Sequence, residues 1–157
     1  MANKGNPMTK PVSRSQVDAF YQAFTSRNPI KIAPFLDDDV EWMIVGPIDL
    51  FAFCGTRHGK AKVLELYESI IPRIITVTRW TTDIILVDHD RAASFNRLTG
   101  LQCQTGRTIS YRVAQFLRFR DGKVVEFRSV LDSFDAAEQM LGHPIDLSNE
   151  ATAELVA

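Results

Sequence analysis

The sequence predicts an α+β fold in which a curved antiparallel sheet wraps around N-terminal helices. Apolar residues recur at helical spacing in the first half of the 157-residue chain, and from Arg79 onward they alternate with a period of two. Thr105-Gly106 and Asp121-Gly122 each separate two apolar runs, as the tight turns of antiparallel hairpins do. Helices come first and a run of strands follows, which is the order typical of an α+β domain.

Two helices are predicted before the first strand. Ser13 and Gln16 form a capping-box pattern, and they begin a helix over residues 13–26 whose apolar stripe consists of Val17, Phe20, Tyr21 and Phe24. Asn28-Pro29 begins a second, short helix, with asparagine as the N-cap and proline at the first helical position. We expect the three aspartates at 37–39 to end this helix.

A strand, a loop and a third helix are predicted next. Val40–Val45 is rich in residues that favour strands. Residues 46–58 are predicted to be a long loop that folds over an apolar surface, because it carries Leu50, Phe51 and Phe53. The third helix begins near Gly59, and Pro72 ends or kinks it.

The second half of the chain is predicted to be an antiparallel meander. Strands are expected near residues 79–87, 91–104, 107–120 and 123–132. The turn between the first two of them contains Asp88-His89-Asp90. A short helix follows at about 133–141, with Gly142 as its C′ residue.

The length and composition indicate one globular domain. We expect residues 13–147 to form it, with flexible tails at 1–12 and 148–157. The formal net charge of −1 gives no electrostatic reason to bind nucleic acid. No apolar stretch reaches the ~20 residues of a membrane span, and the N-terminus lacks the apolar segment of a signal peptide. We therefore expect a cytoplasmic protein with no nucleic-acid or membrane partner.

The sequence predicts no metal and no cofactor. The three histidines lack the spacing of metal ligands, and Cys54 and Cys103 make neither a zinc site nor a disulfide framework. Ala61 stands where a P-loop needs serine or threonine. His58 and Asp49 could each supply an acid or a base at the rim of a pocket; exposure to solvent is the alternative interpretation of both.

Three segments of the chain, in this order and spacing, resemble one known superfamily. They are FLDDDVEW (35–42), GTRHGKAKVLELY (55–67) and RFRDGKVVEFRSVLDSFD (118–135). Over about residues 13–145 the chain resembles the nuclear transport factor 2-like superfamily, which includes the SnoaL-like polyketide cyclases, ketosteroid isomerase and limonene epoxide hydrolase. The resemblance implies a cone-shaped α+β barrel of the cystatin-like or ketosteroid isomerase-like type, with an apolar pocket at its wide end.

Strand alternation predicts which side chains face the inside of the cone. In the last two strands the more apolar sets face inward, namely Ile109, Tyr111, Val113, Gln115 and Leu117, and Val125, Phe127, Ser129 and Leu131. Trp42 and Ile44 face inward from the first strand. The register that the resemblance implies adds Ser94, Asn96, Leu98 and Gly100. A slip of one residue would invert any of these sets.

The positions that carry catalytic groups in the resembling enzymes hold other residues here. By the resemblance, the base aspartate of ketosteroid isomerase corresponds to Ile44, its tyrosine donor to Phe20 and its protonated aspartate to Gln115. The Asp-Arg-Asp arrangement of limonene epoxide hydrolase corresponds to Leu98, Asn96 and Ser129. The resemblance therefore implies the fold and the pocket, and neither of these two mechanisms.

The pocket is predicted to hold a small hydrophobic molecule. Tyr111 and Gln115 are the candidate catalytic residues of a SnoaL-like cyclase or isomerase, because such neutral groups can hydrogen-bond and polarise a ligand carbonyl. The expected ligand-binding residues are Phe20, Trp42, Ile44, Phe53, Asn96, Leu98, Val113, Phe127 and Ser129. In the alternative, these polar groups bond one another or water, and the protein is a non-catalytic binding module or an interaction domain.

The outward-facing side chains of the sheet predict a homodimer. Phe116, Ala114 and Val130 lie in the outward sets, together with Arg112, Arg128 and Glu126. A sheet face of mixed apolar and charged character suits a two-fold contact between identical chains, because such a surface can be complementary to itself.

Overall fold

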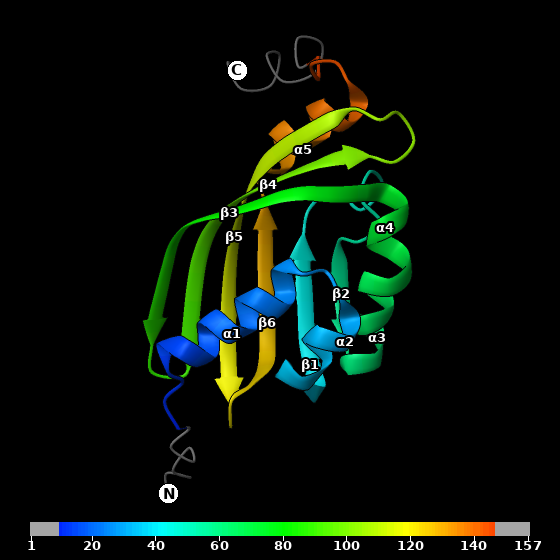
Figure 1. Ribbon diagram of the computed structural model, residues 1–157. Helices are drawn as coiled ribbons and strands as arrows, with labels where there is room; N and C mark the ends of the chain where they lie inside the picture. The colour runs from blue at the N-terminus through cyan, green and yellow to red at the C-terminus, as the bar shows by residue number, and fades with distance from the viewer. Residues whose placement is uncertain (1–9, 147–157) are drawn as a thin grey trace, which may run out of the picture.

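The computed structural model describes residues 10–146, which form one curved sheet with helices packed against it (Figure 1). The strands are β1 (Leu36–Val45), β2 (Gly55–His58), β3 (Ile75–Asp88), β4 (Arg91–Gln102), β5 (Thr108–Arg120) and β6 (Lys123–Leu131). They lie in the order β2-β1-β6-β5-β4-β3. The predicted α+β fold is confirmed. Residues 1–9 and 147–157 lie outside the described residues; they include most of the predicted N-terminal tail, the last residue of the predicted domain and the whole predicted C-terminal tail.

Two helix starts and one helix end lie at residues that the sequence marks. The helical elements are α1 (Arg14–Thr25), α2 (Pro29–Ile32), the 3-10 turn η1 (Ala33–Phe35), α3 (Lys60–Glu65), the π-helical turn η2 (Leu66–Ile70), α4 (Ile71–Ile74) and α5 (Ser133–Leu141). The predicted capping box is present, with Ser13 and Gln16 each accepting the other's amide N–H. Asn28 caps α2, and Gly142 ends α5 in the left-handed conformation.

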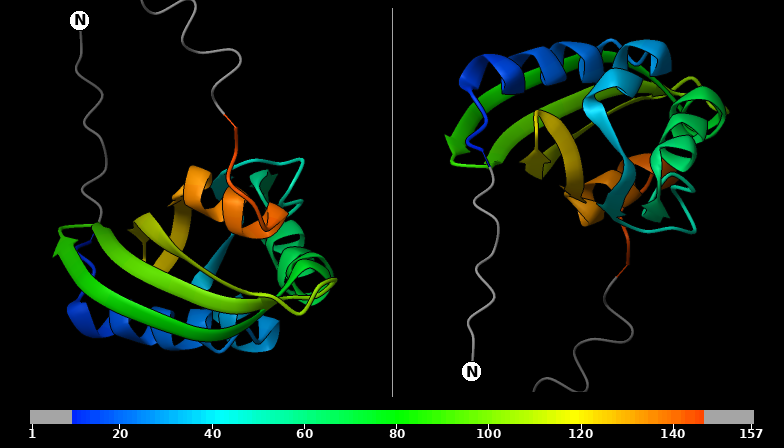
Figure 2. Two further views of the ribbon diagram at one scale, coloured as in Figure 1. Left: turned by 90° about the horizontal axis from the view of Figure 1, so that it is seen from above. Right: turned by 90° about the horizontal axis from the view of Figure 1, so that it is seen from below.

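The helices enclose an aromatic core against the sheet. Helices α1 and α5 lie on opposite sides of β3 and β4 (Figure 2), whereas α3, η2 and α4 run as one segment beside β2 (Figure 1). In the core, Phe24 lies near Trp42 and Phe127, and the Trp42 and Phe127 rings stack with their centres 3.6 Å apart. This cluster connects α1 to the middle of the sheet.

The first strand differs from its prediction in length and direction of pairing. β1 begins at Leu36 instead of Val40, because Leu36 pairs with Val124 of β6. The aspartates at 37–39 therefore lie in this strand, and α2 ends before them. The β1–β6 pairing is parallel, whereas the other four pairings of the described sheet are antiparallel. Three of these four, the pairings that join β3 to β4, β4 to β5 and β5 to β6, were predicted.

Two further strand boundaries were also wrong in the prediction. β2 lies inside the predicted loop at 46–58, where Gly55–His58 pairs with β1. β3 begins at Ile75 instead of Arg79, since Ile75 and Thr76 pair with β4. Ile75 fits helical spacing with Ile71 and also alternates with Val77 as in a strand, so periodicity alone cannot place this boundary.

The predicted inward faces of the sheet are confirmed by burial. The inward sets of β4, β5 and β6 are buried, and the residues between them are exposed or half-buried. Ser94, Gln115 and Ser129 stand opposite one another on three neighbouring strands. They form one polar row across the mainly apolar inner face.

Candidate functional site

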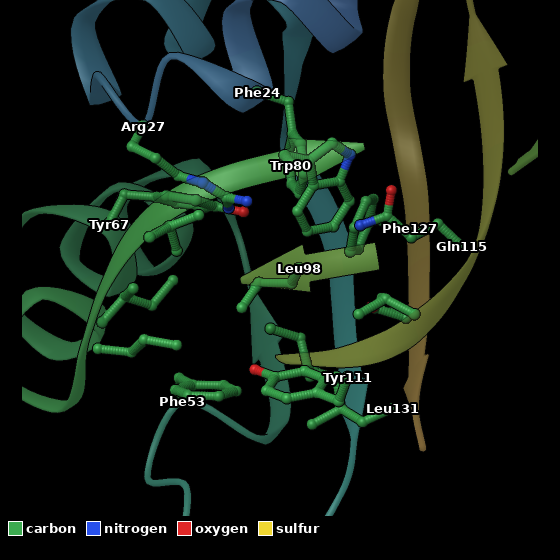
Figure 3. Close-up of a pocket in the computed structure, with 16 residues that line it drawn as sticks. Phe24, Arg27, Phe53, Tyr67, Trp80, Leu98, Tyr111, Gln115, Phe127 and Leu131 are labelled. Atoms are coloured by element: carbon green, nitrogen blue, oxygen red, sulfur yellow. The ribbon is translucent and has the colours of Figure 1, made fainter. Parts of the chain in front are cut away.

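A cavity lies between the inner face of the sheet, the end of α1 and the helical segment η2–α4 (Figure 3). The cavity volume, as traced by the centres of water-sized molecules, is about 40 Å³. With the side chains in these positions, the cavity has room for a few water molecules. A larger ligand requires some of the lining side chains to move. The lining residues are Phe24, Arg27, Ile44, Phe53, Tyr67, Ile71, Ile75, Val77, Trp80, Leu98, Tyr111, Val113, Gln115, Phe127, Ser129 and Leu131.

Most of the predicted site residues are among these, and Tyr111 and Gln115 bring polar groups into the apolar lining. Both are buried, and they lie on β5 with Val113 between them. Burial raises the pKa of Tyr111 above its ordinary value, so the phenol keeps its proton and remains a hydrogen-bond donor. Gln115 accepts a hydrogen bond from the Ser94 hydroxyl at 3.5 Å through Oε1.

Asn96 does not line the cavity, because its hydrogen bonds hold it inside the sheet. Its Nδ2 donates to the Ser94 hydroxyl at 2.8 Å and to the Val113 carbonyl at 3.2 Å. Its Oδ1 accepts from the Thr82 hydroxyl at 2.8 Å, and Ser94 in turn bonds the Tyr21 hydroxyl at 2.7 Å. Both ends of the amide are thus satisfied by the protein, which matches the alternative interpretation of this residue.

Phe20 and Trp42 lie behind the cavity wall. Phe20 packs between α1 and the sheet against Phe35 and Phe119, and Trp42 stacks on the lining residue Phe127. Neither residue is in the lining. Their contribution to the site is the position of the wall, since a rigid aromatic layer fixes the side chains in front of it.

Arg27 alone carries a charge among the described lining residues. Its Cζ lies 4.6 Å from the ring centre of Phe24 and 4.8 Å from that of Trp80, so the guanidinium packs against two aromatic rings (Figure 3). The Tyr67 hydroxyl accepts a hydrogen bond from it. Burial lowers the pKa of Arg27 from its ordinary value, but an arginine remains protonated at neutral pH.

The lining supplies no group suited to accept a proton at neutral pH. Among the described lining residues there is no aspartate, glutamate or histidine. Asp49 lines a different depression, together with Arg73 and Met140, and the His58 ring is exposed near Glu41. In residues 10–146, no cluster of three or more His, Cys, Asp or Glu could hold a metal ion, and no helix is long and apolar enough to cross a bilayer.

Sequence reasoning missed the residues that approach the cavity from the helices and from β3. Arg27, Tyr67 and Trp80 are lining residues that the strand pattern could not identify. A charged residue between a helix and Asn28-Pro29 is usually exposed, so nothing in the local sequence marks Arg27 as buried. Of these three residues, only Tyr67 could have been identified from the sequence, because it lies on the apolar side of the third predicted helix.

Comparison with known proteins identifies the relatives of this fold. The model of the SnoaL-like domain matches residues 17–127. A protein of Rhodopseudomonas palustris, provisionally named an isomerase, shares 35% identity, covers 84% of this chain and 100% of its own, and superposes with a TM-score of 0.76. Among curated proteins, none matches this chain significantly.

Two more distant structures share the fold. An NTF2-like protein of unknown function from Burkholderia pseudomallei is 23% identical over 81% of this chain and 93% of its own, with a TM-score of 0.70. TerC, co-crystallized with polyporic acid, is 21% identical over 81% of this chain and 96% of its own, with a TM-score of 0.70. The structural likeness to the NTF2-like protein shows a shared fold. Since the domain model spans most of the described sheet and its helices, this chain belongs to the SnoaL-like domain family.

Proposed function

We propose that this protein binds a small, mainly apolar molecule in the cavity between α1 and the sheet. The observation that carries this proposal is the lining itself, in which a few polar side chains interrupt an apolar wall. Tyr111 and Gln115 hydrogen-bond an oxygen of the ligand, such as a carbonyl. Its apolar body contacts Ile44, Phe53, Leu98, Val113 and Phe127, with Ser129 beside Gln115 and with Phe20, Trp42 and Asn96 supporting the wall.

A ligand titration followed by tryptophan fluorescence tests this proposal. Trp80 lines the cavity and Trp42 lies behind it, so a ligand changes the emission of Trp80 more than that of Trp42. With a panel of terpenoid, steroid and aromatic ketones, we expect saturable quenching in the wild type and in Trp42→Phe. We expect most of this quenching to be lost in Trp80→Phe. Unchanged emission with every ketone would contradict the proposal.

A second candidate is catalysis by the same groups as a cyclase or isomerase of a carbonyl-containing hydrophobic substrate. Its support is the relative provisionally named an isomerase. Protonated Tyr111 would stabilise an enolate oxygen, but the proton acceptor must come from the substrate or from water, because the described lining has none. For this reason binding is the better-supported function.

Hydrogen exchange next to the carbonyl of a bound ketone separates catalysis from binding. If the protein is catalytic, exchange with deuterium from the solvent exceeds the buffer rate, and Tyr111→Phe lowers it by about 10²-fold or more. The measurement is proton NMR of the ketone in deuterated buffer. Exchange at the buffer rate in both proteins, together with saturable binding, would leave the protein as a non-catalytic binding module.

We further propose that the chain forms a homodimer in the cytoplasm through the outer face of the sheet. Phe95, Phe116 and Val130 are exposed there at 38%, 53% and 41%. Glu126 lies at the side of this patch and pairs with Arg128 at 2.6 Å and with Arg118 at 3.2 Å. An apolar patch with charges of both signs at its edge is suited to an isologous contact.

Reversing the charge of Arg128 tests the dimer. Arg128→Glu removes the ion pair with Glu126 and places two like charges side by side, so we expect the dimer dissociation constant to rise by about tenfold or more. Sedimentation velocity over a concentration series measures it. Phe134→Ala, at an exposed residue of α5, is the control and should not change the dissociation constant. A wild type that stays monomeric at all concentrations would contradict the dimer. We expect Arg128→Glu to retain ligand binding whether or not the wild type forms a dimer.

A further inference from the structure

The cavity contains a cation that the protein does not neutralise. Nε and Nη2 of Arg27 are buried and have no hydrogen-bond partner among the described residues. No ion pair of the described chain involves Arg27, and no carboxylate is in the described lining. A buried charge without a partner is unfavourable for folding, so a residue of this kind needs another reason to be there.

The backbone of Arg27 is a second sign of a special role. Arg27 follows the last turn of α1 and has a φ of +56°, in the left-handed region where glycine or asparagine usually ends a helix. An arginine in this conformation costs about 1–2 kcal/mol. Its amide still donates to the Phe24 carbonyl at 3.2 Å, and its side chain lies back over the Phe24 ring. The helix end thus holds the guanidinium at the cavity.

The unsatisfied groups at this cavity are donors. Besides the two arginine nitrogens, the indole Nε1 of Trp80 is buried without a hydrogen-bond partner among the described residues. The protonated hydroxyl of Tyr111 lies in the same lining and is also able to donate. Buried donors that have no partner, in a cavity with a positive charge, are complementary to an anionic oxygen group.

Arg27 also lies where the cavity meets a depression at the surface. This depression is lined by Pro72 and Thr76, and it shares Arg27, Tyr67, Ile71, Ile75 and Val77 with the cavity. The residue is half-buried overall while its Nε and Nη2 are buried, as expected for a side chain that spans the boundary. A ligand that enters from the depression meets the guanidinium before it reaches Tyr111 and Gln115.

We propose that the ligand of this cavity is an organic anion, with an aromatic or alicyclic body and a carboxylate or similarly acidic oxygen group that binds Arg27. The proposal rests on the proposed binding function and specifies its ligand class. The acidic group accepts from Nε and Nη2, the two neighbouring donors that a planar carboxylate can bridge. The ring system occupies the apolar part of the cavity, and its arrival neutralises the buried charge.

Matched acids and amides test this proposal, because they differ in charge and hardly in shape. Isothermal titration calorimetry at neutral pH would compare benzoate with benzamide and cinnamate with cinnamamide. For the wild type we expect each acid to bind at least about tenfold more tightly than its amide. In Arg27→Gln we expect this preference to disappear while amide binding changes by less than about threefold. Arg27→Lys keeps the charge without the planar fork and should fall between them.

The control is Arg112→Gln, which removes an exposed arginine from β5 outside the cavity lining and should leave the preference for acids intact. Circular dichroism establishes that each variant is folded. Amides that bind the wild type as tightly as the acids, or an acid preference that survives in Arg27→Gln, would overturn the anion assignment and leave the binding function standing. Failure of both the acids and the amides to bind would also overturn the anion assignment, and the ketone panel tests the binding function separately.

Discussion

Replacing Phe127 with alanine is expected to lower the free energy of unfolding by about 3–5 kcal/mol. Phe127 is buried on β6, where its ring stacks on Trp42 at an interplanar angle of 7° and lies 5.7 Å from the Phe24 ring centre. The alanine variant loses both ring contacts and leaves a void next to the existing cavity. Urea unfolding followed by circular dichroism measures the change.

Phe134→Ala is the matched control for this substitution. The Phe134 side chain on α5 is 49% exposed, so its removal should change the free energy of unfolding by no more than about 0.5 kcal/mol. A loss below about 1 kcal/mol in Phe127→Ala would show that the aromatic cluster between α1, β1 and β6 is not the main core. In that case Phe127 and Trp42 would not be the rigid layer that holds the cavity wall in place.

The inner face of the sheet could be predicted from sequence because strand alternation is a strict rule. Tight turns at Thr105-Gly106 and Asp121-Gly122 fix the register of the hairpins, and the register then assigns every side chain of β5 and β6 to one face. Tyr111, Gln115 and Ser129 were therefore predicted to face inward, and they are buried there. This part of the site follows from local patterns alone.

The opposite wall of the cavity could not be predicted, because it depends on contacts between distant segments. Arg27 becomes buried only when Trp80 of β3 packs beside it, and nothing near Arg27 in the sequence specifies that contact. β2 was not predicted for a related reason: a glycine and three polar residues at a sheet edge become a strand only through pairing with β1. In both cases the tertiary partner decides the structure.

Asn96→Asp is expected to lower the free energy of unfolding by about 3–5 kcal/mol at neutral pH, because it places an unpaired negative charge in the buried hydrogen-bond network. Nδ2 of Asn96 donates to the Ser94 hydroxyl and to the Val113 carbonyl, and a carboxylate can donate to neither. Burial raises the pKa of the new carboxyl above its unfolded value of about 3.9. The folded protein favours the neutral acid, so the loss in free energy of unfolding relative to wild type should be complete at a pH above the folded-state pKa. This loss should become smaller as the pH falls through that pKa.

Urea unfolding of both proteins between neutral and mildly acidic pH measures this deficit. Gln104→Glu is the control, because it makes the same amide-to-acid change at an exposed position and should stay within about 0.5 kcal/mol of wild type throughout. An Asn96→Asp protein as stable as wild type at neutral pH, but altered in ligand binding, would mean that Asn96 faces the ligand and not the network. The full deficit would instead place its function in holding β3, β4 and β5 in register behind the cavity.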